Sequence, residues 1–398
     1  MSHPLLKQEI HWVDSEASLN SLCEKWRSCE MLAVDTEFMR SHTYYPIVGL
    51  LQVNDGEANY LIDPTVISDC SSFSDILLDE KLIKVLHSCS EDLEVFQSAL
   101  GVVPRNIFDT QIAASMCGHG FSVGYARLVM MVLEQEVPKE ETRSDWLQRP
   151  LSQSQIDYAA IDVEYLYQLA TILIQKLKAE EKLGWLAEDC QKLLFNYKEN
   201  QGVEFSYLRF KQAWRLSNSK LAVLKALATW REKKARKRDI PRNRVVKEHT
   251  LMEFAMMLPE HVGQLRKFDG MTERMIRSDG AEIIDIINQS LDGDPGDFPD
   301  TLPRPLSSTE NKWAKHLRER VLQIAEAFDL APEVLMKKRD YEALTRFFMP
   351  RENPALEDVL EQLKAFIKGW RYDLLAEPLS ETIYSKTVAA EQAPPSTD

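Results

Sequence analysis

The spacing of apolar residues divides the chain into a first part with strands and helices and a second part with helices. Between residues 1 and 175, apolar runs at 32–34, 48–53, 59–62 and 83–86 have the length and composition of strands. Short connections join the first three runs, which predicts an antiparallel arrangement. Helical spacing follows from about residues 88, 110, 122 and 152. We therefore expect an α/β domain with a mixed sheet flanked by helices.

Two short motifs predict where helices of this first part begin. The segments Ser88–Glu91 and Ser152–Gln155 both have the spacing of a capping box. The first would place Asp92 in the first turn of a helix, where the positive end of the helix dipole favours a carboxylate. The second would begin a helix that carries Tyr158 and Asp162.

The rest of the chain shows helical spacing and no convincing strand. The pattern predicts, in order, an α/β first domain over 1–175, a helical connector over 176–209, a helical bundle over 210–290, a linker over 291–309, a second bundle over 310–375 and a disordered tail over 376–398. The linker is rich in Pro, Gly, Asp and Ser. The two bundles are weakly similar, since each has a first helix with a Trp and a following basic stretch.

Five side chains have an order and a local context that suggest a two-metal nuclease. Asp35 and Glu37 end a buried strand and share one of its faces, because alternate residues of a strand point the same way. Tyr158 and Asp162 share a helix face. Converging acids are costly unless cations neutralise them, and Mg²⁺ or Mn²⁺ prefers such oxygen ligands. Taken alone, the first pair is better explained as the end of a strand and the second as a surface helix face; together with Asp92 they predict a metal site.

Charge is distributed unevenly along the chain. The net charge is −14, but residues 1–200 carry 16 basic and 31 acidic residues (−15) and residues 201–398 carry 32 and 31 (+1). The densest basic run lies in the second half, and a local patch is what a phosphate backbone meets. We expect RNA contact from Arg231, Lys233, Lys234, Arg236, Lys237, Arg238, Arg242, Arg244 and Lys247. The alternative is a basic helix face that is simply solvated.

Cysteine spacing and hydropathy indicate the compartment. The six cysteines form no CxxC pair, which is typical of reduced thiols in a cytoplasmic protein. The sequence shows neither a transmembrane-like stretch nor the basic and apolar regions of a signal peptide. We expect a cytoplasmic monomer with no membrane partner.

These motifs resemble those of bacterial ribonuclease D. The resemblance rests on residues 32–38 (LAVDTEF), 84–96 (KVLHSCSEDLEVF), 108–112 (FDTQI), 145–151 (DWLQRPL) and 158–163 (YAAIDV). Residues 210–290, including 241–247 (PRNRVVK), resemble the HRDC module of that family and of RecQ helicases, and the region after 310 resembles a second, more divergent copy. The four acids and the tyrosine follow the order of the DEDD exonucleases whose final motif has Tyr.

The resemblance implies a ribonuclease H-like exonuclease domain followed by two all-α HRDC-type bundles. It implies a 3′–5′ exoribonuclease that trims tRNA precursors and other small structured RNAs with two divalent ions, Mg²⁺ or Mn²⁺, and releases nucleoside 5′-monophosphates. Asp35, Glu37 and Asp162 would hold one ion, Asp35 would bridge to the second, and Asp92 would support the second. Tyr158 would orient the attacking water, because a tyrosine with a pKa of about 10 is a poor base at neutral pH.

Two other functions stay open at this point. A catalytically idle RNA-binding protein on the same scaffold would be expected to have lost acids, and none is missing. A DNA 3′–5′ exonuclease of proofreading or repair would use the same chemistry, although no GxxxxGK[ST] motor motif is fused to the chain. These motifs do not encode the 2′-OH contacts that separate RNA from DNA.

Overall fold

A six-stranded mixed sheet forms the centre of the first part. The computed structural model describes residues 5–137, 141, 144–199, 202–350 and 355–391. The strands are β1 (Ile10–Val13), β2 (Met31–Met39), β3 (Ile47–Asn54), β4 (Asn59–Ile62), β5 (Ile83–Leu86) and β6 (Ile107–Asp109), in the order β1–β4–β3–β2–β5–β6. β3 is antiparallel to β2 and β4, whereas β1–β4, β2–β5 and β5–β6 are parallel. The predicted mixed sheet and the antiparallel meander are confirmed, and β1 and β6 are additional.

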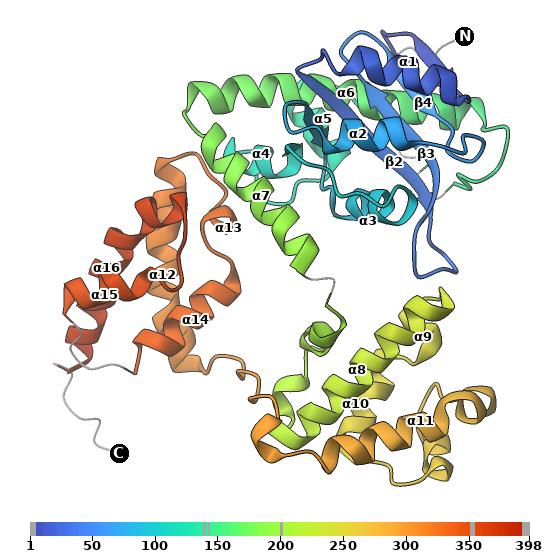
Figure 1. Cartoon of the computed structure of the whole chain (residues 1–398). Coiled ribbons are helices and arrows are strands. Elements are labelled where there is room, and N and C mark those ends of the chain that lie inside the picture. The colour runs from blue at the N-terminus through green and yellow to red at the C-terminus, as the bar shows by residue number, and fades with distance from the viewer. Residues whose placement is uncertain (1–4, 138–140, 142–143, 200–201, 351–354, 392–398) are drawn as a thin grey trace.

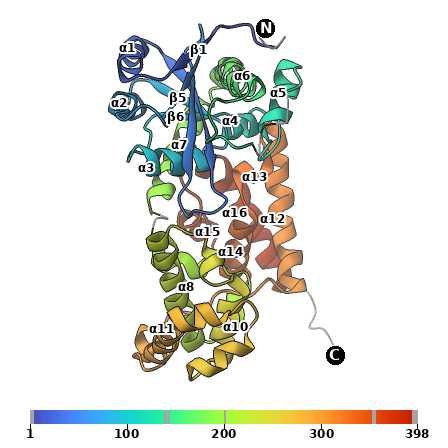
Figure 2. The same cartoon turned by 90° about the vertical axis from the view of Figure 1, so that its right-hand side faces the viewer.

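Helices cover both faces of this sheet. They are α1 (Glu16–Trp26), α2 (Ser71–Leu78), α3 (Ser90–Ala99), α4 (Thr110–Met116), α5 (Tyr125–Leu133) and α6 (Gln153–Ala179). Figure 2 shows α1, α2 and α3 on one side of the strands and α5 and α6 on the other. The boundary expected at residue 175 falls inside α6, so the last turn of this long helix belongs to the first domain.

One predicted capping box is confirmed and the other is wrong, although the helix predicted after it is present. The Ser152 hydroxyl accepts the Gln155 amide at 3.1 Å, and the Gln155 side chain accepts the Ser152 amide at 3.0 Å, which completes the capping box of α6. At α3 the residue before the helix is Cys89, whose side chain makes no cap bond. The Asp109 carboxylate instead accepts the amides of Ser88 and Cys89 at 3.2 and 3.0 Å.

The described residues after α6 contain helices and no strand. These are α7 (Leu183–Glu199), η1 (Val203–Arg209), η2 (Ala213–Arg215), α8 (Asn218–Arg238), α9 (Arg242–Val245), α10 (Glu248–Met257), η3 (Val262–Lys267), α11 (Glu273–Leu291), η4 (Pro295–Asp297), α12 (Ser308–Ala327), α13 (Pro332–Leu335), α14 (Lys338–Phe348), α15 (Leu356–Leu363) and α16 (Trp370–Glu391). Figure 1 shows them as a connecting helix, α7, and two bundles, α8–α11 and α12–α16.

The C-terminal helix corrects the expected tail. Residues 376–391 belong to α16, and Leu379 and Ile383 are fully buried in the second bundle. This bundle therefore extends past residue 375. Residues 392–398 of the expected tail lie outside the described residues.

The second bundle packs on the first domain through α7. The Trp185 and Trp370 rings stack with centroids 4.6 Å apart, and the Arg371 guanidinium donates two hydrogen bonds of 2.6 Å to the Asp189 carboxylate. The Lys182 ammonium donates to the Phe328 carbonyl at 2.6 Å. The first domain and α12–α16 share one apolar core, whereas α8–α11 have their own.

The described residues contain no candidate membrane-spanning helix and no disulfide. In the described part of the chain, no helix combines the length and apolarity that crossing a bilayer requires. All six cysteines lie in the described ranges and are free thiols.

Candidate metal centre and active site

Strand β2 positions two of the predicted metal ligands where it leaves the core. Its first four residues are buried, and the half-buried Asp35 and Glu37 follow with Thr36 between them. The pairing of β2 with β3 shifts between Glu37 and Phe38, where Gly49 lies unpaired on β3. A Cβ atom at this glycine would lie 2.5 Å from the Trp146 carbonyl oxygen, so the segment before α6 can approach β3 only over a glycine.

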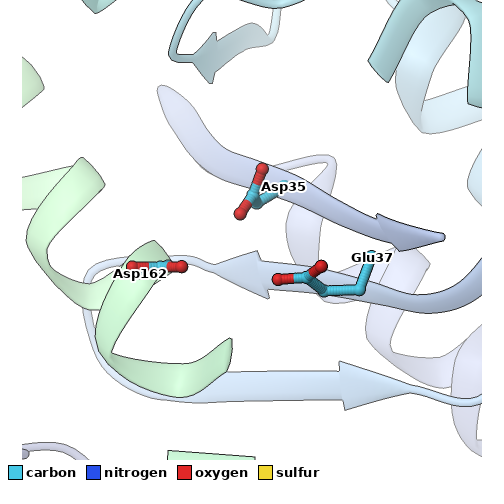
Figure 3. Close-up of side chains that lie close together, drawn as sticks. All are labelled: Asp35, Glu37 and Asp162. Carbon is cyan, nitrogen blue, oxygen red and sulfur yellow. The ribbon is translucent and has the colours of Figure 1, made fainter. Parts of the chain in front are cut away.

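Helix α6 brings a third carboxylate to this point. Asp35, Glu37 and Asp162 each present one carboxylate oxygen that lies within 4.8 Å of the oxygens of the other two. Figure 3 shows Asp162 on its helix and the carboxylates of the two β2 residues turned toward it. Asp162 is 6 % exposed, and its Oδ1 atom is buried without a hydrogen-bond partner. An all-oxygen donor set with an unpartnered buried oxygen fits a divalent cation.

Burial and mutual repulsion raise the pKa values of the three carboxylates, so that simultaneous ionisation of all three is unfavourable. Burial raises the pKa of Asp35 from 3.8 to about 7. Burial and then the charges of Asp35, Asp162 and Asp92 raise the pKa of Glu37 to about 10. The pKa values of Asp162 and Asp92 lie well above their ordinary range, chiefly through burial and then through Asp35. Without a cation the cluster therefore holds protons at neutral pH.

This electrostatic strain predicts a pH-dependent stability of the metal-free protein. An acid whose pKa is raised in the folded state destabilises the fold as pH rises from its unfolded value, 3.8 for Asp35, to its folded value of about 7. In EDTA, Asp35→Asn should therefore have a higher melting temperature than the parent at about pH 8 and a similar one at about pH 4. Thermal unfolding at both pH values checks this. An advantage of equal size at both would contradict it.

Asp92 lies in the first turn of α3, as predicted, but outside the group of three carboxylates. It is buried, and it accepts a hydrogen bond of 2.6 Å from the Thr36 hydroxyl. Thr36 thus links Asp92 to the strand segment that carries Asp35 and Glu37. The structure places this fourth acid beside the cluster.

Tyr158 lies one turn before Asp162 on the same face of α6. The spacing of four residues on this helix places its ring beside the Asp162 carboxylate. Burial and the charges of Asp162, Glu37 and Asp35 raise the pKa of Tyr158 far above its ordinary value of 10. The hydroxyl therefore stays protonated and acts as a hydrogen-bond donor at neutral pH.

The sequence motifs do not predict the contacts that two further residues, Tyr125 and Thr36, make with the site. The hydroxyl of Tyr125, on α5, donates to the backbone carbonyl of Asp162. Thr36 is visible in the sequence only as the residue between two acids. Their contacts join elements that are distant along the chain, so spacing does not reveal them.

The structure divides the basic run of 231–247 into bonded and free cations. Arg231 is buried. Arg236 and Arg242 form ion pairs with Glu232, and Lys234 and Arg238 form ion pairs with Asp279. Lys247 forms an ion pair with Asp269, and Arg244 hydrogen-bonds to His42. Among the described residues, no acid lies within ion-pair distance of Lys233 or Lys237. These two lysines and Lys225 line a groove of about 770 Å³ between α8 and α11.

Comparison with known proteins defines the class and then the family. Residues 10–178 match the 3′–5′ exonuclease family model and residues 220–287 match that of the HRDC domain. With the carboxylate cluster, they define a 3′–5′ exonuclease with an HRDC module. Ribonuclease D of Pseudomonas paraeruginosa is 41% identical over 377 residues, which are 95% of this chain and 98% of the relative. The chain belongs to the ribonuclease D family and is a 3′–5′ exoribonuclease.

A second curated relative and a solved structure are also similar to this chain over nearly its whole length. Ribonuclease D of Escherichia coli K12 is 35% identical over 92% of this chain and 96% of its own. The crystal structure of Escherichia coli RNase D, described as an exoribonuclease involved in structured RNA processing, superposes with a TM-score of 0.82 at 32% identity and covers 96% of this chain and 99% of that chain. The HRDC match covers α8–α11, so a second HRDC-like module in α12–α16 stays a prediction.

Proposed function

We propose that this exoribonuclease trims the 3′ ends of tRNA precursors and other small structured RNAs and releases nucleoside 5′-monophosphates. The observation that carries the proposal is the carboxylate cluster, with its unpartnered buried oxygen, on a chain similar to ribonuclease D over nearly its whole length. The solved relative is described as acting in structured RNA processing. An idle scaffold would have no need to keep three carboxylates in mutual repulsion.

The donor set suggests which residues hold two divalent ions, Mg²⁺ or Mn²⁺. In the proposal, Asp35, Glu37 and Asp162 hold one ion, Asp35 also reaches the second, and Asp92 supports the second through water. When bound, such ions lower the pKa of a water molecule and neutralise charge on the leaving oxygen. Asp162 presents its free Oδ1 atom, and Thr36 keeps the Asp92 carboxylate oriented.

Tyr158 is proposed to orient the attacking water rather than to deprotonate it. Its raised pKa keeps the hydroxyl protonated, and its place one turn before Asp162 on α6 puts it beside the carboxylates. Tyr158→Phe should reduce kcat by about 10²-fold and leave metal affinity nearly unchanged. Single-turnover kinetics and metal-binding calorimetry check the two parts. Loss of metal binding with the hydroxyl would assign Tyr158 a structural role instead.

Parallel digestion of two substrates tests the substrate class. We expect a tRNA precursor with extra 3′ nucleotides to be shortened one nucleoside 5′-monophosphate at a time, and a single-stranded DNA of equal length to be degraded much more slowly. Asp35→Ala protein, purified in parallel, controls for contaminating nucleases. Equal rates on both substrates would favour the DNA exonuclease, and no digestion of either would favour the idle RNA-binding protein.

The free lysines on α8 are the proposed RNA contacts outside the active site. Replacing Lys225, Lys233 and Lys237 with Ala should reduce the slope of log Kd against log salt by about 2 to 3, since each phosphate contact contributes about 0.7 to 0.9. Filter binding of a structured RNA at several salt concentrations measures this. Replacement of three exposed lysines outside the two helical bundles, Lys81, Lys178 and Lys198, is the matched control. An equal change in both triple variants would contradict a specific groove.

A further inference from the structure

The turn between β2 and β3 leaves the first domain and docks on the first helical bundle. Figures 1 and 2 show this hairpin extending from the sheet toward α8 and α9. At its tip, Tyr44 is 7 % exposed and lies in the apolar core of α8–α11. Among the described residues, it is the one member of that core that comes from the exonuclease domain. The contact therefore joins the catalytic domain to a module far along the chain.

Polar contacts fix the tip of this hairpin. The Tyr44 hydroxyl donates to Glu232 and accepts from Arg242 Nη2 at 2.9 Å and Arg236 Nε at 3.1 Å. The backbone amides of Tyr44 and Tyr45 both donate to the Asp239 carboxylate, at 2.9 and 3.0 Å. Arg236 and Arg242, which the sequence analysis predicts to contact RNA, thus bind a segment of the same chain.

The acid at the centre of this joint is buried and charged. Glu232 is 3 % exposed. Burial opposes its ionisation, but hydrogen bonds from Arg242 and Tyr44 and the charges of Arg242 and Arg236 lower its pKa to about 2. A buried charge needs its complete set of partners. Loss of the Tyr44 hydroxyl would remove one of them.

The same hairpin is tied to the elements that carry the carboxylates. The hairpin follows directly after β2, the strand that holds Asp35 and Glu37. At its base, the Arg40 guanidinium donates to the Tyr44 carbonyl at 2.9 Å and pairs with Glu94. Glu94 lies on α3, two residues after Asp92. Arg40 therefore connects the docked tip with the helix of the fourth acid.

We propose that Tyr44 is a positioning residue for the metal centre. Docking of the 40–46 hairpin on α8 fixes β2 relative to α3, and thereby sets the placement of Glu37 and Asp92 for divalent cations. Geometry errors of about 0.5 Å in such a site are enough to weaken it. The inference rests on the proposed metal roles of these acids, and it gives the HRDC module a part in catalysis separate from RNA capture.

Paired substitutions of buried acids in the same module test this. Glu232→Gln weakens the joint, whereas Asp279→Asn weakens an ion pair with Arg238 inside the module. Both acids are 3 % exposed, so the two variants should lose similar stability. We expect Tyr44→Phe and Glu232→Gln to lower the affinity for Mn²⁺, measured by calorimetry on the full-length protein, by about 10-fold, and Asp279→Asn to leave it unchanged.

Cleavage of a short single-stranded RNA gives the second readout. The Mg²⁺ concentration for half-maximal cleavage should rise in Tyr44→Phe and Glu232→Gln, while KM for the RNA changes little. The proposal is overturned if both variants bind Mn²⁺ and cleave short RNA like the parent, or if all three variants lose metal affinity equally. Either result leaves the test of Asp35→Ala intact, so failure of this inference is distinguishable from failure of the proposed function.

Discussion

Replacing Asp35 or Asp162 with Ala should lower the rate of RNA trimming by at least about 10³-fold while the protein stays folded. Each of these acids offers an oxygen within 4.8 Å of its neighbours' oxygens, and no other acid of the described chain joins that group. Loss of one carboxylate removes a cation ligand. It also relieves the repulsion that raises the pKa of Glu37, so the metal-free fold should gain stability rather than lose it.

Rapid-quench assays with saturating Mg²⁺ measure this effect, and thermal unfolding verifies the fold. Asp157→Ala is the matched control, because Asp157 is a buried acid of the same helix that accepts a hydrogen bond from Gln153 at 2.9 Å and lies outside the cluster. Its activity should stay within a few-fold of the parent. Near-parental trimming by Asp35→Ala would refute the assignment of the site.

Local periodicity predicts which of the site's acids share a face of their own strand or helix, but not that the two faces meet. The rule that alternate strand residues share a face brought Asp35 and Glu37 together, and the helical repeat did the same for Tyr158 and Asp162. Their meeting depends on α6 packing across β2, which spacing alone does not determine. Asp92 illustrates this limit: its place in the first helical turn was predicted, but its bond to Thr36 follows from tertiary packing.

Long-range hydrogen bonds explain the predictions that failed. The motif at Ser88–Glu91 has the spacing of a capping box, yet the amides of Ser88 and Cys89 are satisfied by Asp109, which comes from the next strand. The composition of the last residues predicts a disordered tail from residue 376. Burial of Leu379 and Ile383 in the second bundle keeps this stretch helical despite Pro378.

The basic run shows why charge in a sequence does not define a binding surface. Arg242 and Arg236 are neutralised by Glu232 from within the run, and Arg238 by Asp279 from another helix. Tyr44 joins the same cluster from the opposite half of the chain. Lys233 and Lys237 have no such partner among the described residues, and we propose these lysines as phosphate contacts.

Replacing Asp189 with Ala should weaken the attachment of the second bundle to the catalytic domain. Its carboxylate receives two hydrogen bonds of 2.6 Å from Arg371, and the two side chains are only 12 % and 17 % exposed. Removing one partner of a buried ion pair leaves the other charge unpaired and costs about 3 to 5 kcal/mol. Because α12–α16 share an apolar core with the first domain, the free energy of unfolding of this joint unit should fall by that amount.

Urea unfolding followed by tryptophan fluorescence can detect this, because the stacked rings of Trp185 and Trp370 report on the same contact. Arg304→Ala is the control: Arg304 is 58 % exposed in its pair with Glu310, and surface pairs contribute about 0 to 1 kcal/mol. Deleting the bundle would be a poorer test, since it would strip apolar cover from α7. If Asp189→Ala unfolds like the parent, the stacked tryptophans and the shared core hold the bundle without the ion pair, and the bundle's attachment is apolar in origin.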